Sequence, residues 1–173
     1  MLKARSVINR STLITLYYSF VYPYFIYCNH IWGTSTNKNM KRLFTLQKKA
    51  VRLICHAKFR ADTDPLFKEF KFLNVWQINK FLIGQFMYKH QNLKLPALFD
   101  DNFTRFSDIH SIDTRQSPNQ YQIPRVRTEY RKASICFRGP SIWNDIMKKH
   151  ISPDVTLMTF KYHLKVLLLS GSI

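Results

Sequence analysis

One segment of the chain, residues 37–57, constrains the fold more than any other, because apolar and basic side chains recur in it with the period of an α-helix. At about 100° per residue, one arc of such a helix would carry Met40, Leu43, Phe44, Gln47, Ala50, Val51 and Ile54, with Leu46 and Leu53 at one side. The opposite arc would carry Lys38, Lys41, Arg42, Lys48, Lys49 and Arg52. A helix with this pattern buries its apolar arc and exposes the other, so the sequence predicts an amphipathic surface helix.

The positive charge of the chain is concentrated at its N-terminal end. The first acidic residue is Asp62, so residues 1–61 hold eleven Lys and Arg side chains and no carboxylate, within a net charge of +17. Hydrophobic residues make up 46% of the chain and aromatic residues 15%, which a disordered polycation does not contain, so the chain can bury a core. The expected partner is a polyanion, either nucleic acid or an anionic membrane surface.

The basic arc of residues 37–57 has two interpretations: a solvated helix face, or a surface that contacts phosphates. No acid offsets its charge, so we expect phosphate contact, in which counterion release rather than base reading supplies the affinity. RNA, DNA and an RNA–DNA hybrid are all suitable ligands for such a surface. The residues expected to contact phosphates are Lys38, Lys41, Arg42, Lys48, Lys49 and Arg52, with a second set of Arg125, Arg127, Arg131 and Lys132.

Residues 13–28 are apolar and follow a basic leader, which superficially resembles a signal sequence. The stretch is shorter than the roughly 20 residues of a membrane-spanning helix. It also contains Pro23, and no small-residue cleavage site follows it. We therefore expect a buried core helix that begins after an N-cap at Ser11, runs to about Trp32 and breaks before Pro23. The protein is expected to be intracellular, nuclear or cytoplasmic, and the three cysteines without paired spacing suit a reducing compartment.

The rest of the chain is predicted to be mostly helical, with one polar arm. A short helix is expected to open at Asp62 or Asp64, and a longer one over residues 74–91 is apolar all round and therefore buried. Residues 104–134 are polar and predict an extended arm, with short strands at Tyr121–Ile123 and Ser134–Phe137. The last two helices are expected to start at Gly139-Pro140 and at Ser152-Pro153, the second one ending before Gly171.

The predicted fold class is accordingly mainly α, a helical bundle with a short-stranded β appendage near residues 104–138. Three segments are expected: a helical bundle over residues 1–100, an extended basic arm over residues 101–138 and C-terminal helices over residues 139–173. The changes of composition and the turn residues mark these boundaries.

No pattern in the sequence predicts a catalytic, cofactor-binding or metal-binding residue. The four glycines stand alone, so there is no phosphate-binding loop, and the His and Cys residues lack the spacing of a metal site. Adjacent Asp100 and Asp101 follow Phe99, as aspartates do in polymerases that use two metal ions. Neither flanking segment has the alternating apolar and polar residues of a β-strand, so we interpret both aspartates as loop or helix-cap residues.

Several short segments follow one another along almost the whole chain, and their order forms a specific pattern. They are Leu2–Arg5, Ser11–Leu13, Leu16–Tyr24, Tyr27–Gly33, Leu46–Arg52, Ile83–Tyr88, His110–Arg115 and Phe137–Asn144, followed by the closing leucine-rich basic helix. This pattern resembles the region after the polymerase core in jockey-like, LINE-type reverse transcriptases of non-LTR retrotransposons.

The resemblance implies a helical thumb and a carboxy-terminal extension of an RNA-directed DNA polymerase, a region that lies along the template–primer duplex. The family holds Mg²⁺ with palm aspartates in a Phe/Tyr-Ala-Asp-Asp hairpin, which no residue here matches, so no catalytic residue is transferred. The leading hypothesis is a non-catalytic, nucleic-acid-binding fragment. Two alternatives are a helical protein-interaction subdomain that docks on the palm and fingers of the polymerase, and a protein of anionic membrane surfaces, which we consider less suitable. His110 and Arg115 are interpreted as residues of a hydrogen-bonded polar loop.

Overall fold

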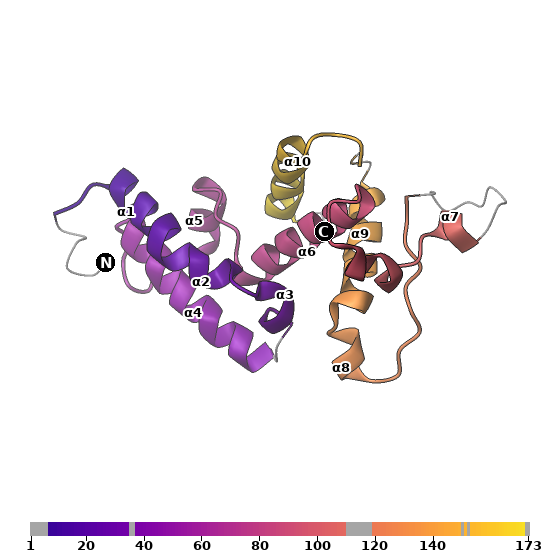
Figure 1. Cartoon of the computed structure of the whole chain (residues 1–173). Coiled ribbons are helices and arrows are strands. Elements are labelled where there is room, and N and C mark those ends of the chain that lie inside the picture. Colours follow the sequence, from indigo (N-terminus) through magenta and orange to yellow (C-terminus); the bar gives the residue numbers. More distant parts are fainter. Residues whose placement is uncertain (1–6, 35–36, 110–118, 150, 152, 172–173) are drawn as a thin grey trace. The chain divides into compact units, whose positions relative to one another are not determined.

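The protein is built of helices in the residues that the computed structural model describes, which are 7–34, 37–109, 119–149, 151 and 153–171 (Figure 1). These residues contain one isolated antiparallel bridge, between Arg105 and Tyr121, and no longer ladder. The predicted mainly helical fold class is therefore confirmed, whereas the described residues do not show the predicted β appendage beyond this bridge. The chain forms two compact units, one up to Asn79 and one from Lys80 onward. The three segments predicted from composition, with boundaries after residues 100 and 138, stay a prediction.

The first unit begins with a run of short helical pieces rather than the single helix predicted from residue 11. Its elements are α1 (Arg10–Leu16), a π-helical turn (Tyr17–Val21), α2 (Tyr22–Ile26), α3 (Asn29–Trp32), α4 (Asn37–Ile54) and α5 (Asp64–Glu69). The N-cap is Asn9, not Ser11, because the Asn9 side chain accepts a 2.9 Å hydrogen bond from the Thr12 N–H.

The interruption expected near Pro23 takes the form of the π-helical turn that precedes it. Proline has no N–H to donate to the carbonyl four residues back, and a widened turn is one way to accommodate that loss. The helical run ends only at Tyr27, and Cys28 follows in the left-handed region with φ +48°. The break that re-directs the chain into α3 therefore lies after Pro23, not before it.

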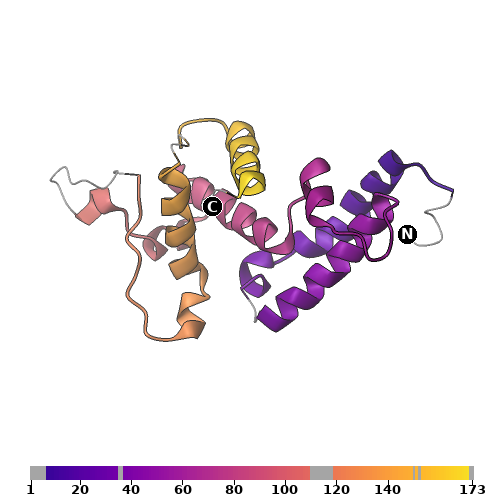
Figure 2. The same cartoon turned by 180° about the vertical axis from the view of Figure 1, so that it is seen from behind.

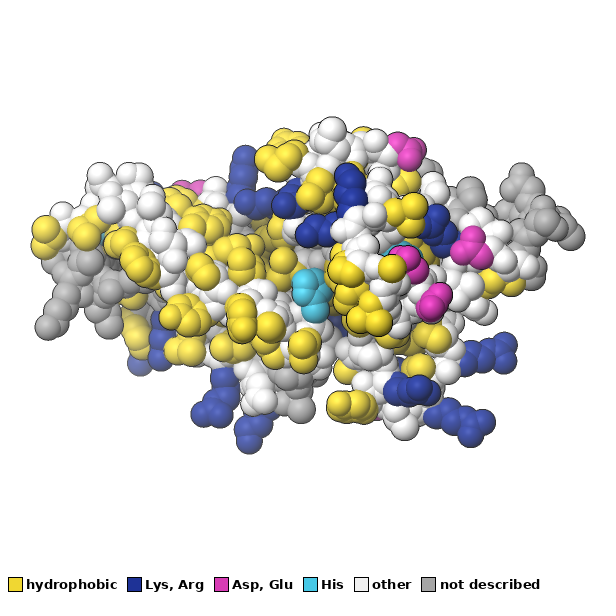
Figure 3. Space-filling model, viewed as in Figure 1, with side chains coloured by type: hydrophobic (Ala, Val, Ile, Leu, Met, Phe, Trp, Pro, Cys, Tyr) yellow, Lys and Arg dark blue, Asp and Glu magenta, His cyan; other side chains and the backbone are white. Residues whose placement is uncertain are grey.

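The core of the first unit forms where the apolar arc of α4 packs against α1 and the π-helical turn, which lie beside it in both views (Figure 2). Leu13, Tyr17, Val51 and Ile54 are at most 1% exposed. Dark-blue Lys and Arg side chains line the outer edge of α4 (Figure 3). The predicted helix over residues 37–57 is confirmed as far as Ile54, three residues short of the expected end.

The next long helix, α6 (Val75–Gln91), begins at a reciprocal cap and is buried as predicted. The N–H of Asn74 donates to the Gln77 side chain and the N–H of Gln77 donates to the Asn74 side chain, each over 2.9 Å. Its residues Ile78 and Ile83 are fully buried. The boundary between the two units falls within this helix.

After α6, the described residues of the second unit form a 3₁₀ helix (Ala97–Asn102), α7 (Phe106–Ile109), α8 (Glu129–Lys132), α9 (Ile135–Met147) and α10 (Leu157–Ser170). Three predictions are wrong here. Ser134–Phe137 opens α9 instead of forming a strand, Gly139-Pro140 lies inside α9, and α10 begins after Thr156 rather than at Ser152-Pro153. The glycine before Pro140 removes one obstacle to a continuous helix, because it has no Cβ to clash with the proline ring. A Cβ at Gly139 would also come within 2.7 Å of Met87 Sδ. The predicted end of the last helix at Gly171 is confirmed.

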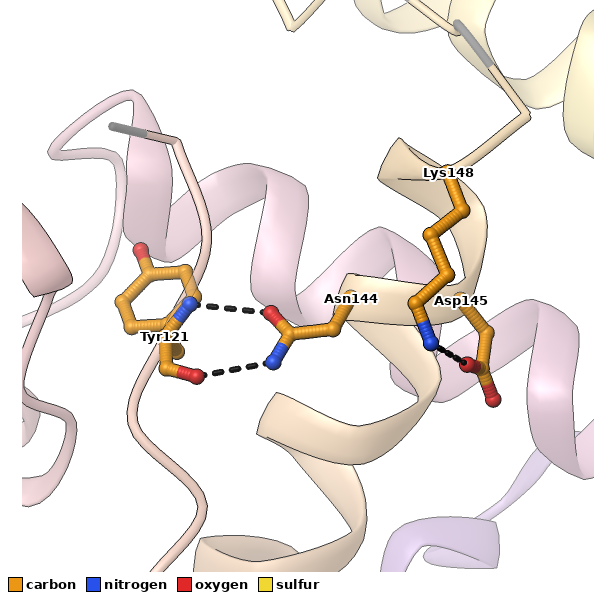
Figure 4. Close-up of polar contacts among 4 residues, drawn as sticks. All are labelled: Tyr121, Asn144, Asp145 and Lys148. Atoms are coloured by element: carbon orange, nitrogen blue, oxygen red, sulfur yellow. Dashed lines mark hydrogen bonds and ion pairs between the residues drawn. The ribbon is translucent and has the colours of Figure 1, made fainter. Parts of the chain in front are cut away.

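The extended segment predicted as Tyr121–Ile123 is held on one side by residues 104–106 and on the other by side chains of α9. The Gln122 N–H donates to the Thr104 carbonyl over 2.9 Å, and the Phe106 N–H donates to the Gln120 carbonyl over 3.1 Å. The N–H of Tyr121 donates to Asn144 Oδ1 over 2.9 Å, and Asn144 Nδ2 donates to the Tyr121 carbonyl over 2.8 Å (Figure 4). The Trp143 indole N–H donates to the Asn119 carbonyl over 2.8 Å. The Phe137–Asn144 segment therefore has a clear structural role, because its polar side chains pair with the Tyr121 backbone groups that the short antiparallel bridge does not use.

Replacing Asn144 by leucine should lower the free energy of unfolding by about 2–4 kcal/mol, because two buried backbone groups of Tyr121 lose their partners. Urea denaturation followed by tryptophan fluorescence measures this loss. The matched control is Asp145→Asn on the same helix, which removes only an exposed ion pair with Lys148 and should change stability by less than about 1 kcal/mol. Equal effects of the two substitutions would contradict the role assigned to Asn144.

A buried histidine completes the packing around Tyr121. His90 is 5% exposed, and its Nδ1 lies 2.8 Å from the Tyr121 hydroxyl, which donates to Gln91 Oε1 over 2.8 Å. Burial, and then the positive charge of Arg105, lower the pKa of His90 below its ordinary value. Burial also raises the pKa of Tyr121 to about 12, so this cluster is neutral near pH 7.

Acid should therefore weaken this cluster. As the pH falls through 6.5, the ordinary pKa of histidine, His90 takes up a proton in the unfolded chain before it does in the folded one. The stability that the neutral ring contributes is fully present above that value and declines below it. We expect the unfolding free energy of the wild type to fall more between about pH 7.5 and about pH 5.5 than that of His90→Gln. An identical decline in both proteins would show that His90 does not carry this dependence.

Candidate nucleic-acid interface

On the solvent face of α4, four basic side chains have no hydrogen-bond or ion-pair partner among the residues that the structure describes; these are called the free cations below. Lys38, Lys41, Arg42 and Lys49 are all exposed, and none has a hydrogen-bond or ion-pair partner for its side chain among the described residues. The two ion pairs found in the described part of the chain both belong to the second unit. The four charges therefore remain available to an external anion.

The other two predicted contacts on α4 are engaged within the first unit. Lys48 is half-buried with its Nζ 4.4 Å from the centre of the Phe44 ring, and this cation–π contact holds the side chain along the helix. Arg52 is also half-buried, and its Nε donates to the Ala61 carbonyl over 2.8 Å. The predicted set of six thus separates into four free cations and two that already have structural contacts.

The second predicted set lies in the second unit and is less concentrated. Arg125 and Arg127 lie in an extended segment, while Arg131 and Lys132 belong to the one-turn helix α8. All four are exposed, but Lys132 forms an ion pair with Glu129 of the same turn. Internal pairing and a short helix make this set a weaker candidate for phosphate contact than α4.

Asp100 and Asp101 lie in the 3₁₀ helix, both exposed, and not on a strand hairpin. Both residues are interior to that helix, whose caps are Pro96 and Phe103, so their interpretation as loop or helix-cap residues is wrong. Within the described ranges, no group of three or more His, Cys, Asp and Glu residues lies close enough together to hold a metal ion. His110–Arg115 lies outside the described residues.

A hydrophobic groove on the first unit was missed by the sequence analysis, which assigned residues 13–28 to the core. The groove has a volume of about 420 Å³, and its lining residues are Phe20, Val21, Tyr24, Phe25, Trp32, Leu43 and Leu46. Phe20 is 68% exposed and Tyr24 is 81% exposed, so these two aromatic rings stand at the surface. Figure 3 shows hydrophobic side chains gathered over α2 and α3. The spacing of Phe20 and Tyr24 by four residues is the sequence signal that could have indicated a shared helix face.

The apolar residues 13–28 also raise the question whether this segment could span a membrane. In the part of the chain that the structure describes, no helix has both the length and the apolar character needed to cross a bilayer. Residues 10–26 are divided into α1, the π-helical turn and α2, and the first of these contributes Leu13 to the protein core.

Comparisons with known proteins do not assign a family. No protein-family model, curated protein or solved structure matches this chain. The case for this interface therefore rests on the chemistry of its own residues. The resemblance to non-LTR retrotransposon reverse transcriptases remains a proposal.

The separation of free from engaged cations on α4 can be tested by stability. Arg52→Ala should lower the free energy of unfolding by about 1–2 kcal/mol, because the Ala61 carbonyl loses a charge-assisted hydrogen bond. Lys41→Ala, on the same helix, should change it by less than about 0.5 kcal/mol, since the Lys41 side chain contacts solvent. Thermal unfolding followed by circular dichroism compares the two, and a larger loss for Lys41→Ala would contradict the assignment.

Proposed function

We propose that this chain is a non-catalytic nucleic-acid-binding fragment, comparable to the thumb and C-terminal region of a non-LTR retrotransposon reverse transcriptase. The observation that carries the proposal is the solvent face of α4, where Lys38, Lys41, Arg42 and Lys49 are exposed and unpaired among the described residues. The proposed ligand is the phosphate backbone of RNA, DNA or an RNA–DNA hybrid of template and primer.

The physical argument rests on how this face is held. The apolar arc of α4 is buried through Val51 and Ile54, so the opposite arc is presented in a fixed register rather than on a flexible tail. Cations one turn apart on such a face can neutralise phosphates and release their counterions, which favours binding without regard to sequence. The residues around Arg125 and Arg131 are proposed as a second, weaker contact.

The proposal assigns no chemical step to this chain. In the resembling family the aspartates that hold Mg²⁺ belong to the palm, and no residue here matches their motif. The palm and fingers of such a polymerase are accordingly proposed as protein partners. The proposed location is intracellular, either nuclear or cytoplasmic, where nucleic acid is the abundant polyanion.

The alternative function is a helical protein-interaction subdomain that docks on a polymerase core and has no independent activity. The hydrophobic groove with its exposed Phe20 and Tyr24 is the observation that favours it.

Charge reversal on α4 tests the proposal. The triple variant Lys41→Glu, Arg42→Glu, Lys49→Glu should lower the affinity for an RNA–DNA hybrid by about tenfold or more, because three phosphate contacts become repulsive. Fluorescence anisotropy with a labelled hybrid measures the affinity. Far-UV circular dichroism should remain unchanged, because these side chains face solvent.

The matched control reverses three exposed bases elsewhere in the first unit, Lys58, Arg60 and Lys68, and changes the net charge by the same amount. It should weaken binding much less. Equal losses in both variants would mean that overall charge, not the face of α4, attracts the ligand. A folded wild type that self-associates and binds no hybrid would instead favour the protein-interaction alternative.

A further inference from the structure

The hydrophobic groove on the first unit lies directly beside the free cations of α4. Its α4 wall is formed by Leu43 and Leu46. On a helix, residues three and four positions apart are surface neighbours. Leu46 is therefore flanked by Arg42 on one side and by Lys49 on the other, and both of these bases are exposed. The groove thus has a cationic edge along α4.

The opposite walls of the groove are aromatic. Four of its seven lining residues, namely Phe20, Tyr24, Phe25 and Trp32, have aromatic side chains. Phe20 and Tyr24 stand at the surface, whereas Phe25 is buried beneath them. Flat π-faces at a cationic edge are the two features with which proteins bind single-stranded nucleic acid, stacking bases while tracking phosphates.

Hydrogen bonds hold these walls in place without any ligand. The Trp32 indole N–H donates to the Tyr27 carbonyl, and the Asn29 side chain donates to the Phe25 carbonyl over 2.8 Å. Asn79 of α6 in turn donates to Asn29 Oδ1 over 2.8 Å. The backbone at Phe25 and the Trp32 ring are therefore fixed before a ligand arrives, which lowers the ordering cost for this part of the wall.

We propose that this groove binds unpaired bases of a single-stranded nucleic-acid segment, which stack on Phe20 and Tyr24 while Arg42 and Lys49 contact the adjoining phosphates. The inference rests on the proposed function and deepens it, because it names an unpaired extension as the part of the ligand that the groove recognises. Charge complementarity supports this occupant, since the groove and the first 61 residues contain no carboxylate that would repel phosphates. An acidic amphipathic helix would satisfy the same charges but would not need the exposed aromatic faces.

Two ligands separate base stacking from duplex binding: a blunt RNA–DNA hybrid, and the same hybrid with a short single-stranded extension that contains 2-aminopurine. The wild type should bind the extended hybrid about tenfold more tightly, the order of one base–aromatic stack. Its binding should also quench the 2-aminopurine fluorescence. Tyr24→Ala should abolish most of the tenfold preference and the quenching, while its affinity for the blunt hybrid stays unchanged. Tyr24→Trp, which keeps a π-face, should retain both.

The control variant is Tyr162→Ala, which removes a similarly exposed tyrosine of α10 outside the groove and should behave as the wild type. If Tyr24→Ala keeps the preference for the extension while the charge-reversed α4 variant loses binding, the groove proposal is overturned and the proposed function stands. If neither hybrid is bound by the wild type, both are overturned. The proposal is also contradicted if the groove mediates self-association of the protein. In that case Tyr24→Ala would lose self-association in sedimentation without any change in quenching.

Discussion

The burial of one arc of α4 is the interaction on which the rest of this account depends. Val51 and Ile54 pack with Leu13 and Tyr17, and Gln47 adds hydrogen bonds to the Tyr17 hydroxyl and the Leu73 carbonyl. A helix held in this way has no freedom to turn its basic arc inward. Because no acid precedes Asp62, the exposed arc finds no neutralising partner in its own stretch of chain. The first unit therefore stabilises itself through apolar contacts while it presents positive charge to its surroundings.

In the second unit, an extended segment pairs with residues 104–106 through one isolated antiparallel bridge, and side chains hold its other side. Asn144 imitates a neighbouring strand by pairing with both backbone groups of Tyr121, and the Tyr121 side chain is anchored at the other end by His90 and Gln91. The N–H, the carbonyl and the hydroxyl of Tyr121 each have a named partner, as buried polar groups require. The indole of Trp143 extends the same arrangement to Asn119. The residues Trp143 and Asn144 thus have a structural role in holding this segment.

Long periodic patterns were predictable from the sequence, and features that depend on a tertiary neighbour were not. The helices α4 and α6 are correctly predicted because their apolar side chains recur over four or more turns. The start of α9 was misplaced because Pro140 is a strong helix-start signal by itself, whereas the helix begins after Ser134 and contains the proline in its interior. The strand expected at Tyr121–Ile123 is reduced to a single bridge with Arg105, and the Asn144 side chain, which no sequence pattern indicated, pairs with the Tyr121 backbone. The groove was missed because residues 13–28 are apolar throughout, and only the packed structure shows which of their rings stay exposed.

The most direct test of the central claim is the salt dependence with which the unmodified chain binds an RNA–DNA hybrid, measured by fluorescence anisotropy. Four free cations on α4 predict that the logarithm of the affinity falls linearly with the logarithm of the salt concentration, with a slope of about −3 to −4. A slope of that size would mean that several phosphates are neutralised together on one face. A folded, monodisperse sample that does not bind at low salt, or whose affinity is independent of salt, would contradict the account.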